Sequence, residues 1–242
     1  MRITSYIISI IAALLITSCG KNGSDNGSKD SAGNGNDTIS KSFTITDFNG
    51  IDIEGAASVH FTQGDKYAIT AKGKQKDISL LELTKKNRTL VIKKKKIDKE
   101  KLITINTSDI HLYITAPEME KVRIIGSGDF ICQTPLNAGK FSAIIAGSGD
   151  VHMGKITTEA LESKIAGSGD IVIEHAITSG INLDIAGSGD INISMENSGD
   201  VISYISGSGD ITLRGQTMGE RHHVSGSGDV NTDGLEVKNK QE

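Results

Sequence analysis

The chain has 242 residues, and its composition argues against an ordinary globular enzyme of that size, because aromatic residues make up only 4% and tryptophan is absent. With 28 glycines and two prolines, the interior must be filled mainly by Ile, Leu and Val, which suits stacked β-layers around a narrow core. The formal net charge of −4 hides a split between a basic stretch, with twelve Lys/Arg and four Asp/Glu in residues 72–101, and an acidic one, with seven Lys/Arg and sixteen Asp/Glu in residues 126–242. The sequence contains no basic patch interleaved with aromatic residues, so it does not predict nucleic-acid binding.

The N-terminus predicts an exported lipoprotein. Ile7–Ile16 is an apolar stretch that is too short to span a bilayer, which takes about 20 residues. The stretch ends in Ile16-Thr17-Ser18-Cys19-Gly20, which resembles a bacterial lipobox: an aliphatic residue, two small residues and a cysteine. We therefore expect residues 1–19 to form a lipoprotein signal peptide and Cys19 to carry the lipid that anchors the protein to a membrane. An ordinary signal peptide that happens to contain a cysteine is the alternative.

The next segments predict a tether and then a sheet. Residues 20–41 contain Gly, Ser, Asn, Asp and Lys with almost nothing apolar, so they predict a flexible polar tether. Residues 42–125 alternate apolar and polar side chains, as in Ile51-Asp52-Ile53 and in Ile110-His111-Leu112-Tyr113-Ile114. This alternation predicts strands with one buried face, and no long segment has helical spacing. We expect this region to form the N-terminal β-rich part of the fold.

The second half of the chain is a repeat. Gly-Ser-Gly-Asp begins at residues 126, 147, 167, 187, 207 and 226, so successive copies are 21, 20, 20, 20 and 19 residues apart. An apolar residue follows each Asp directly, in the series Phe130, Val151, Ile171, Ile191, Ile211 and Val230. A second apolar series lies two residues before each motif, at Ile124, Ile145, Ile165, Ile185, Ile205 and Val224. Each unit therefore consists of a strand, a glycine corner, a second strand and a variable connection.

These units predict a stack of coils. Ordering twenty residues costs on the order of 20–40 kcal/mol of backbone entropy, more than the roughly 8–15 kcal/mol that five buried side chains return. One coil alone cannot fold, but stacked coils share apolar columns and hydrogen bonds. The predicted fold is an all-β, single-stranded, right-handed parallel β-helix with coils of about 20 residues, repeating through residues 126–237 and followed by a polar tail at 238–242. An antiparallel meander is the competing architecture, although nothing in a meander requires identical corners.

The corner aspartates have two interpretations. Asp129, Asp150, Asp170, Asp190, Asp210 and Asp229 could each accept hydrogen bonds from backbone amides in their own corner. Alternatively, stacking would bring these carboxylates within about 5 Å of one another, and Ca²⁺ could relieve the repulsion, as in calcium-binding β-rolls with their nine-residue repeat. The period here is twice as long and the motif differs, so the first interpretation is favoured and the calcium ladder is a secondary hypothesis.

The lysine run, the cysteines and the histidines are weaker candidates for binding or catalysis. Lys93-Lys94-Lys95-Lys96 could contact phosphate or anionic lipid, but such runs are usually solvated. If Cys19 is lipidated, Cys132 has no partner for a disulfide and is predicted to be a small buried residue. His222 and His223 would point to opposite faces of a strand, and no His/Cys set has metal spacing. The sequence therefore predicts no catalytic residues and no cofactor.

The sequence resembles a known family. Phe48-Asn49-Gly50-Ile51-Asp52-Ile53, Gln63-Gly64-Asp65, Ile114-Thr115-Ala116-Pro117 and the Gly-Ser-Gly-Asp array are similar to the auto-transporter adhesin, head GIN domain family of Bacteroidetes lipoproteins, over about residues 42–235. The resemblance implies a single-stranded right-handed β-helix and brings no catalytic residues.

Three functions remain open at this point. The favoured one is a non-enzymatic, lipid-anchored envelope protein, an adhesin or interaction module that binds a protein or glycan partner and no nucleic acid. A structural or calcium-stabilised envelope protein is the second, and a carbohydrate-active enzyme on a β-helix is the third. The enzyme is disfavoured because Tyr204 is the only Tyr in the repeats and Arg is scarce. The expected location is the outer membrane, on the surface or the periplasmic face, since the residues after Cys19 lack a strongly acidic export run.

Overall fold

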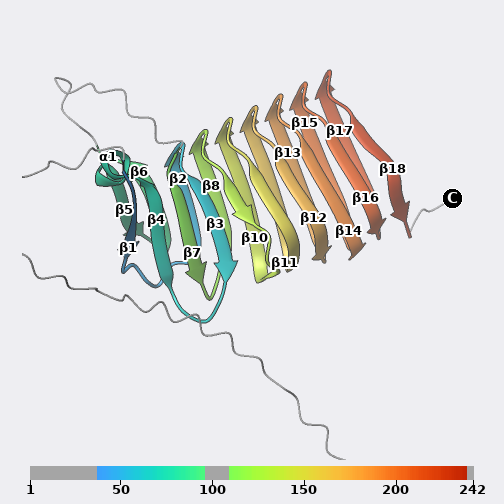
Figure 1. Cartoon of the computed structure of the whole chain (residues 1–242). Coiled ribbons are helices and arrows are strands. Elements are labelled where there is room, and N and C mark those ends of the chain that lie inside the picture. The colour runs from blue at the N-terminus through green and yellow to red at the C-terminus, as the bar shows by residue number, and fades with distance from the viewer. Residues whose placement is uncertain (1–36, 96–108, 239–242) are drawn as a thin grey trace, which may run out of the picture. The chain divides into compact units, whose positions relative to one another are not determined.

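The computed structural model describes residues 37–95 and 109–238 (Figure 1). These residues form eighteen strands and one short helix. The elements are β1 (Thr38–Phe43), β2 (Gly50–Gly55), β3 (Ser58–Gln63), β4 (Ala68–Lys74), α1 (Gln75–Ser79), β5 (Leu81–Lys86), β6 (Thr89–Lys94), β7 (His111–Ala116), β8 (Lys121–Gly126), β9 (Phe130–Cys132), β10 (Leu136–Gly147), β11 (Val151–Gly167), β12 (Ile171–Thr178), β13 (Gly180–Gly187), β14 (Ile191–Ser198), β15 (Asp200–Gly207), β16 (Ile211–Thr217), β17 (Glu220–Gly226) and β18 (Val230–Val237).

The repeats stack as a parallel β-solenoid, as predicted. The strands that lead into the corners pair in the order β8, β10, β11, β13, β15 and β17, and every pair is parallel. The strands that leave the corners pair in the order β9, β11, β12, β14, β16 and β18, again all parallel. The register follows the repeat, since Ile165 lies beside Ile145 on one side and Ile185 on the other. The antiparallel meander is excluded for this region.

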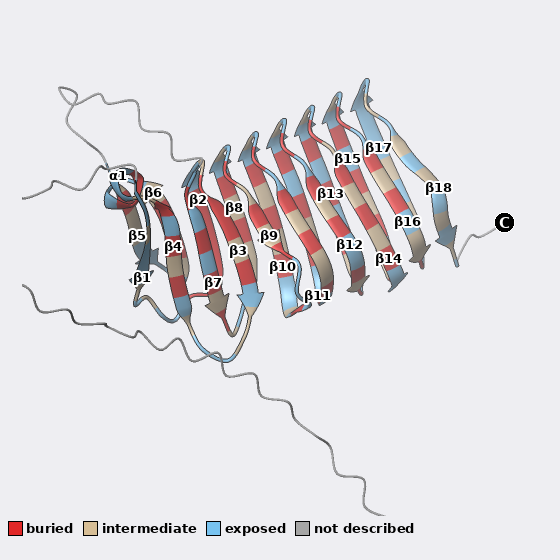
Figure 2. Cartoon of the chain, in the orientation of Figure 1, coloured by how far each residue is buried: buried red, intermediate tan, exposed pale blue. Residues whose placement is uncertain are grey.

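The apolar columns predicted from the repeat form the core (Figure 2). The residue after each corner is fully buried from Phe130 to Ile211, and the column before the corners is at most 2% exposed from Ile124 to Ile205. The burial pattern alternates along strands such as β13 and β15, so one face points inward and the other to solvent. Only the last coil breaks the pattern, because Val224 is 40% exposed where its column ends.

The N-terminal coil is inserted out of sequence order. β2 pairs in parallel with β8 on one side and with β6 on the other, and β3 lies between β9 and β7 in the same way. The coil at residues 50–63 therefore separates β6 and β7 from the repeats. Arg123 fixes this arrangement by donating two hydrogen bonds to the carboxylate of Asp52, a buried residue 71 positions earlier; Nε lies 3.1 Å from Oδ1. This insertion was not predicted from the sequence.

Antiparallel strands cover the N-terminal end of the stack. β4 pairs antiparallel with β7 and with β1, and β5 pairs antiparallel with β6. α1 connects β4 to β5 and contacts both β4 and β1. β1 begins at Thr38, so the last four residues of the predicted tether belong to a strand; Ile39 packs against the core and the backbone of β4 supplies the hydrogen bonds. The predicted tether boundary at residue 41 was therefore too late.

The two ends of the solenoid differ. Following the pairs from β1 through β4, β7, β3, β9, β11, β12, β14 and β16 leads to β18, which puts β1 and β18 at opposite edges. Nine steps of about 4.8 Å separate them by roughly 43 Å. Within the described residues, β17 and β18 each pair along one edge only. The N-terminal end is thus covered by α1 and antiparallel strands, and the C-terminal coil is open.

Candidate functional site: the corner ladder and the open terminal coil

Each corner requires glycine at two positions, which share a close contact with the preceding coil, and the first of them also has a positive φ. Gly167 has a φ of +152°, a backbone conformation that side chains disfavour. Gly169 has no such φ, but a Cβ built on it would lie 2.0 Å from the carbonyl oxygen of Gly149 in the preceding coil. The same close contact recurs along the stack, so the second glycine is required by the distance between coils. The repeated Gly-Ser-Gly therefore serves the packing of corner on corner.

The corner aspartates form a hydrogen-bonded ladder between coils. One carboxylate oxygen, Oδ1, accepts a hydrogen bond from the backbone amide of the equivalent Asp in the next coil, at 2.9 Å from Asp150 to Asp170. The other members of the ladder are Asp129 to Asp150 (3.3 Å), Asp170 to Asp190 (2.9 Å), Asp190 to Asp210 (2.8 Å) and Asp210 to Asp229 (2.8 Å). Each Asp was expected from the sequence to cap an amide of its own corner, but the amide that it caps lies one coil further on.

The backbone explains this ladder. Ser168 donates its amide to Gly147 in the preceding coil, whereas Ile171 donates to Asp190 in the following coil. Because the direction of donation reverses between these residues, the amide of Asp170 faces no backbone carbonyl and is satisfied by a side chain instead. The negative carboxylates thus meet N–H groups, which are favourable partners for an anion.

The calcium hypothesis receives no geometric support in the described part of the chain. No group of three or more His, Cys, Asp or Glu side chains there is close enough to hold a metal ion. Five of the six carboxylates also use one oxygen on an amide. The six aspartates thus form a structural ladder, and calcium binding stays an untested prediction.

A melting experiment tests calcium binding directly. We expect the melting temperature of the purified protein in EDTA to be unchanged when millimolar Ca²⁺ is added. A site with a Kd one hundred times below the Ca²⁺ concentration would add about 2.7 kcal/mol to the free energy of unfolding. For a chain of this size that is a rise of roughly 5–11 °C. Such a rise, lost in an Asp170→Asn variant, would establish the ladder as a calcium site.

A shallow open trough runs along the bends opposite the corners. It has a volume of 610 Å³ and crosses the coils from β10 to β14. Its lining includes Asn137, Thr157, Glu159, Ile177, Ser179 and Asn197. Gln63 fixes one end of the trough by exchanging two hydrogen bonds with the backbone of Asn137, at 2.8 and 2.9 Å. The lining is mostly uncharged, which suits contact with an extended polar chain but provides no acid, base or nucleophile set.

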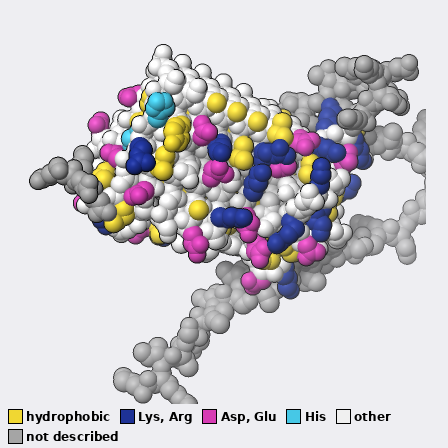
Figure 3. Space-filling view, turned by 180° about the vertical axis from the view of Figure 1, so that it is seen from behind, with side chains coloured by type: hydrophobic (Ala, Val, Ile, Leu, Met, Phe, Trp, Pro, Cys, Tyr) yellow, Lys and Arg dark blue, Asp and Glu magenta, His cyan; other side chains and the backbone are white. Residues whose placement is uncertain are grey.

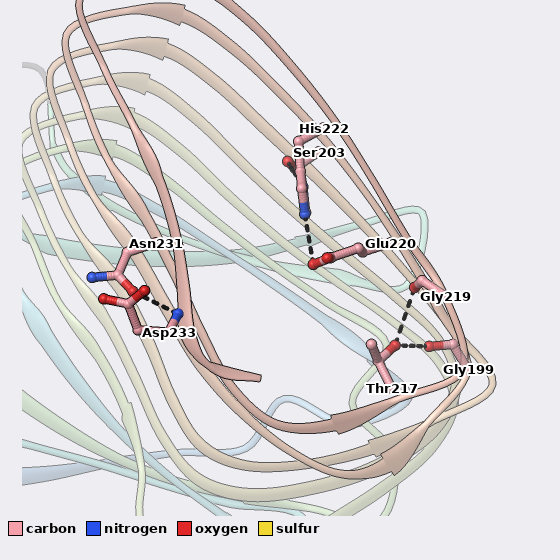
Figure 4. A network of polar contacts seen from close by, with 8 residues as sticks. All are labelled: Gly199, Ser203, Thr217, Gly219, Glu220, His222, Asn231 and Asp233. Atoms are coloured by element: carbon pink, nitrogen blue, oxygen red, sulfur yellow. Dashed lines mark hydrogen bonds and ion pairs between the residues drawn. The ribbon is translucent and has the colours of Figure 1, made fainter. Parts of the chain in front are cut away.

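The terminal coil is held by a network of polar contacts (Figure 4). Thr217 donates a hydrogen bond to the carbonyl of Gly199 in the coil below. His222 points inward, with Nδ1 2.7 Å from Ser203 Oγ and Nε2 3.1 Å from Glu220 Oε2. Asn231 Oδ1 accepts the amide of Asp233 at 3.0 Å. The contacts of Thr217 and His222 therefore tie successive coils together at the C-terminal end, where the two apolar columns end in Val224 and Val230.

The order Ser203, His222 and Glu220 is that of a nucleophile, a base and an orienting carboxylate. The side chain of Ser203 is, however, fully buried beneath the terminal coil. A substrate carbonyl could not approach its Oγ, which nucleophilic attack requires. In this structure the three residues close the end of the core, and they do not form an accessible catalytic site.

Exposed apolar side chains gather in the last two coils. Of the five large hydrophobic residues exposed in the described ranges, Tyr204 (53%), Met218 (40%) and Val224 (40%) lie there. Met218 lines a hollow of 400 Å³ together with Asp200, Ile202 and Arg221, and Tyr204 lies two residues beyond Ile202 on the same strand. Tyr204 could be noted from the sequence, but this hollow could not, because Met218 lies in the variable connection between β16 and β17 and Arg221 follows it at the start of β17.

The charge split is visible on the surface. Figure 3 shows one face on which Lys and Arg side chains crowd toward the N-terminal end, while a histidine lies beside hydrophobic side chains toward the other. Lys93, Lys94 and Lys95 border a second hollow together with Glu54 and Glu82. Lys93 lies 3.6 Å from the Glu82 carboxylate. These carboxylates oppose the binding of a phosphate, and Lys96 falls outside the described residues.

Of the two cysteines, the structure describes Cys132 but not Cys19. Cys132 is fully buried, as predicted, and burial raises the pKa of its thiol to about 11, so little thiolate is available for reaction. Cys19, the tether up to residue 36 and the signal peptide lie outside the described residues. Lipidation therefore stays a prediction from the sequence. Within the described ranges, no helix is long and apolar enough to cross a membrane.

A cluster of rings on the N-terminal coils was not anticipated. His60 Nε2 lies 3.1 Å from His111 Nδ1, and the His60 ring stacks on Tyr113 with centroids 5.0 Å apart. Burial, followed by the charge of His111, lowers the pKa of His60, and Asp129 opposes the shift. The alternation of β3 and β7 predicted outward-facing residues here, but only the parallel pairing of these two strands brings the rings together.

The described chain thus belongs to the class of parallel β-solenoids. A family model described as "Putative auto-transporter adhesin, head GIN domain" matches residues 47–179 and 174–241. The chain therefore belongs to this family, and the resemblance inferred from the motifs is confirmed. No curated protein is similar enough to match.

Solved structures have the same fold. An adhesin-like protein from Bacteroides fragilis, described as a "putative adhesin", has a TM-score of 0.65 at 20% identity, and the match covers 81% of this chain and 96% of that one. A "putative lipid binding protein" from Parabacteroides distasonis has a TM-score of 0.65 at 22% identity, covering 82% and 97%. A "putative adhesin" from Parabacteroides merdae has a TM-score of 0.56 at 19% identity, covering 82% and 97%. At these identities the likeness concerns the fold alone.

Proposed function

We propose that this protein is a non-enzymatic, lipid-anchored binding protein of the bacterial cell envelope, an adhesin or interaction module that presents its solenoid to a protein or glycan partner. The observation that carries the proposal is the direction of the stack. The chain enters the described part at Asp37, which accepts a hydrogen bond from the Gln75 amide at the first residue of α1. The open coil of β17 and β18 is at the opposite edge, roughly 43 Å away.

This direction suits an anchored binding protein. If Cys19 carries the lipid and residues 20–36 act as a tether, the covered end faces the membrane and the open coil faces away from it. Membership of an adhesin family supports a role in binding at the envelope. The outer membrane is the proposed location, and the outward or periplasmic face depends on how the anchored protein is sorted.

Fractionation and adhesion assays test this proposal. We expect the full chain, produced in a bacterium that processes lipoproteins, to sediment with membranes and to increase retention of the cells on a coated surface. Cys19→Ala should release the protein into the soluble envelope fraction and abolish the extra retention. Cys132→Ala is the matched control, because it removes the other cysteine and should leave anchoring unchanged. Membrane association or retention that survives Cys19→Ala would contradict the proposal.

A further inference from the structure

Tyr204 has an uncovered aromatic face, unlike the other exposed tyrosine. It lies on β15 and is 53% exposed. Its one ring neighbour in the described chain, His223, is tilted by 56° with centroids 6.3 Å apart. Tyr113, by contrast, has the His60 ring nearly parallel to it and the ammonium of Lys72 4.8 Å from its centroid. Tyr204 is therefore the described tyrosine whose ring is free to stack on a ligand.

Polar groups that could bind a ligand lie beside this ring. Strand pairing puts Asp184 and His223 on either side of Tyr204, and Ile202 two residues along the same face. The 400 Å³ hollow begins at Ile202 and Arg221 and continues to Asp200. In the described part of the chain, the carboxylate of Asp200 and the guanidinium of Arg221 make no hydrogen bond or ion pair. An open aromatic face thus adjoins a concave surface with unused donors and acceptors.

We propose that Tyr204 and this hollow form a binding site for a neutral saccharide. The apolar face of one sugar ring would stack on Tyr204, while hydroxyls further along the saccharide would bond to Arg221, opposite Ile202, and to Asp200, four residues along the strand. An exposed aromatic ring with an adjacent pocket and a few convergent polar groups is the pattern of a small-ligand site. The hollow is lined by two carboxylates, those of Asp200 and Glu220, and by the one guanidinium of Arg221, and this balance disfavours an acidic sugar.

The main alternative occupant is a β-strand added to the open edge of the terminal coil. The edge strand β18 discourages it, because the register between β16 and β18 shifts between Thr212 and Arg214, which marks a bulge, and Asp233 at this bulge carries a charge. Bulges and charges are the devices by which sheet edges avoid pairing. The saccharide site rests on the proposed function, since it assumes that the terminal coil faces away from the membrane.

The test is binding of the full chain, in mild detergent, to an array of neutral and acidic oligosaccharides. We expect selective binding to neutral members, lost by about tenfold or more in Tyr204→Ala and retained in Tyr204→Phe, which keeps the ring. Arg221→Ala should also weaken binding. Tyr113→Ala is the matched control and should bind as the wild type does. Circular dichroism melting of each variant confirms that it is folded.

Each result is decisive for the site. Absence of binding across the array, preference for acidic sugars, or equal binding by Tyr204→Ala would overturn the saccharide site. Binding of an extended peptide that Tyr204→Ala does not alter would indicate strand addition instead. If the array fails while retention of cells still depends on Cys19, the proposed function stands and the site is wrong. If retention also fails to depend on Cys19, the proposed function fails with it.

Discussion

Replacing Gly169 by alanine is expected to lower the free energy of unfolding by about 3 kcal/mol or more. The new Cβ would lie 2.0 Å from the carbonyl oxygen of Gly149, a contact with backbone that no rotamer change can relieve. The two coils would have to separate at this corner, which weakens the hydrogen bonds and the buried columns on both sides. For a chain of this size, the melting temperature should fall by roughly 6–12 °C, measurable by circular dichroism or calorimetry.

Gly180→Ala is the matched control. Gly180 lies in the same solenoid, at the start of β13, and a Cβ there would have its nearest neighbour, the Asp200 carbonyl oxygen, 4.0 Å away. Its φ is outside the left-handed region. Alanine should therefore be neutral or should stabilise by about 0.4–1 kcal/mol, because it restricts the unfolded chain. Similar melting temperatures for Gly169→Ala and Gly180→Ala would show that close stacking does not explain the glycine repeat.

The fold of the repeats could be predicted from the sequence because several independent sequence features indicate the same structure there. The apolar residues, the glycine corners and the 20-residue period all lead to one register, in which Ile145, Ile165 and Ile185 stack. Residues one period apart pair in the parallel ladder, so the register could be predicted without knowing the geometry of any turn. Cys132 follows the same register, since it pairs with the equivalent Met153 of the next coil and both are fully buried.

The N-terminal region could not be predicted in the same way. Alternation reveals strands, but it does not reveal which strands pair when no period relates them. The coil at residues 50–63 has Gly55 where later coils have the first corner glycine, but Ala57 and Ser58 where they have Gly and Asp. Because its corner sequence differs from Gly-Ser-Gly-Asp, this coil cannot be recognised from the sequence as equivalent to the repeats. Its insertion before β8 depends on contacts such as that between Arg123 and Asp52, which are distant in sequence.

The candidate binding site was only partly accessible from sequence. Tyr204 could be recognised as the single tyrosine of the repeats. Its open ring face depends on the tilt of His223, and the hollow depends on the bend between β16 and β17, where no column is conserved between coils. The aspartate ladder shows the same limit, since the choice between a cap in the same coil and a cap in the next one depends on the direction of the backbone amides.

Phe130→Ala is the second large effect that we expect. Phe130 is fully buried at the start of β9, where the N-terminal coil meets the repeats, and its ring stacks with that of Phe61 at a centroid distance of 6.0 Å. Loss of a buried Phe side chain costs about 3–5 kcal/mol through lost burial and the cavity left behind. Denaturant unfolding should report a decrease of that size in the free energy of unfolding.

A double-mutant cycle makes this a test of the out-of-order coil. Phe61 and Phe130 belong to β3 and β9, which lie side by side only because the coil at residues 50–63 is inserted next to the repeats. Combining Phe61→Ala with Phe130→Ala should give a coupling energy of about 0.5–1.5 kcal/mol, as expected for aromatic side chains in contact. Combining Phe61→Ala with Ile191→Ala, on the more distant strand β14, should be additive. Additivity in the first pair would mean that the rings do not meet and that the N-terminal coil lies elsewhere, whereas coupling in the first pair alone requires the stacking order described here.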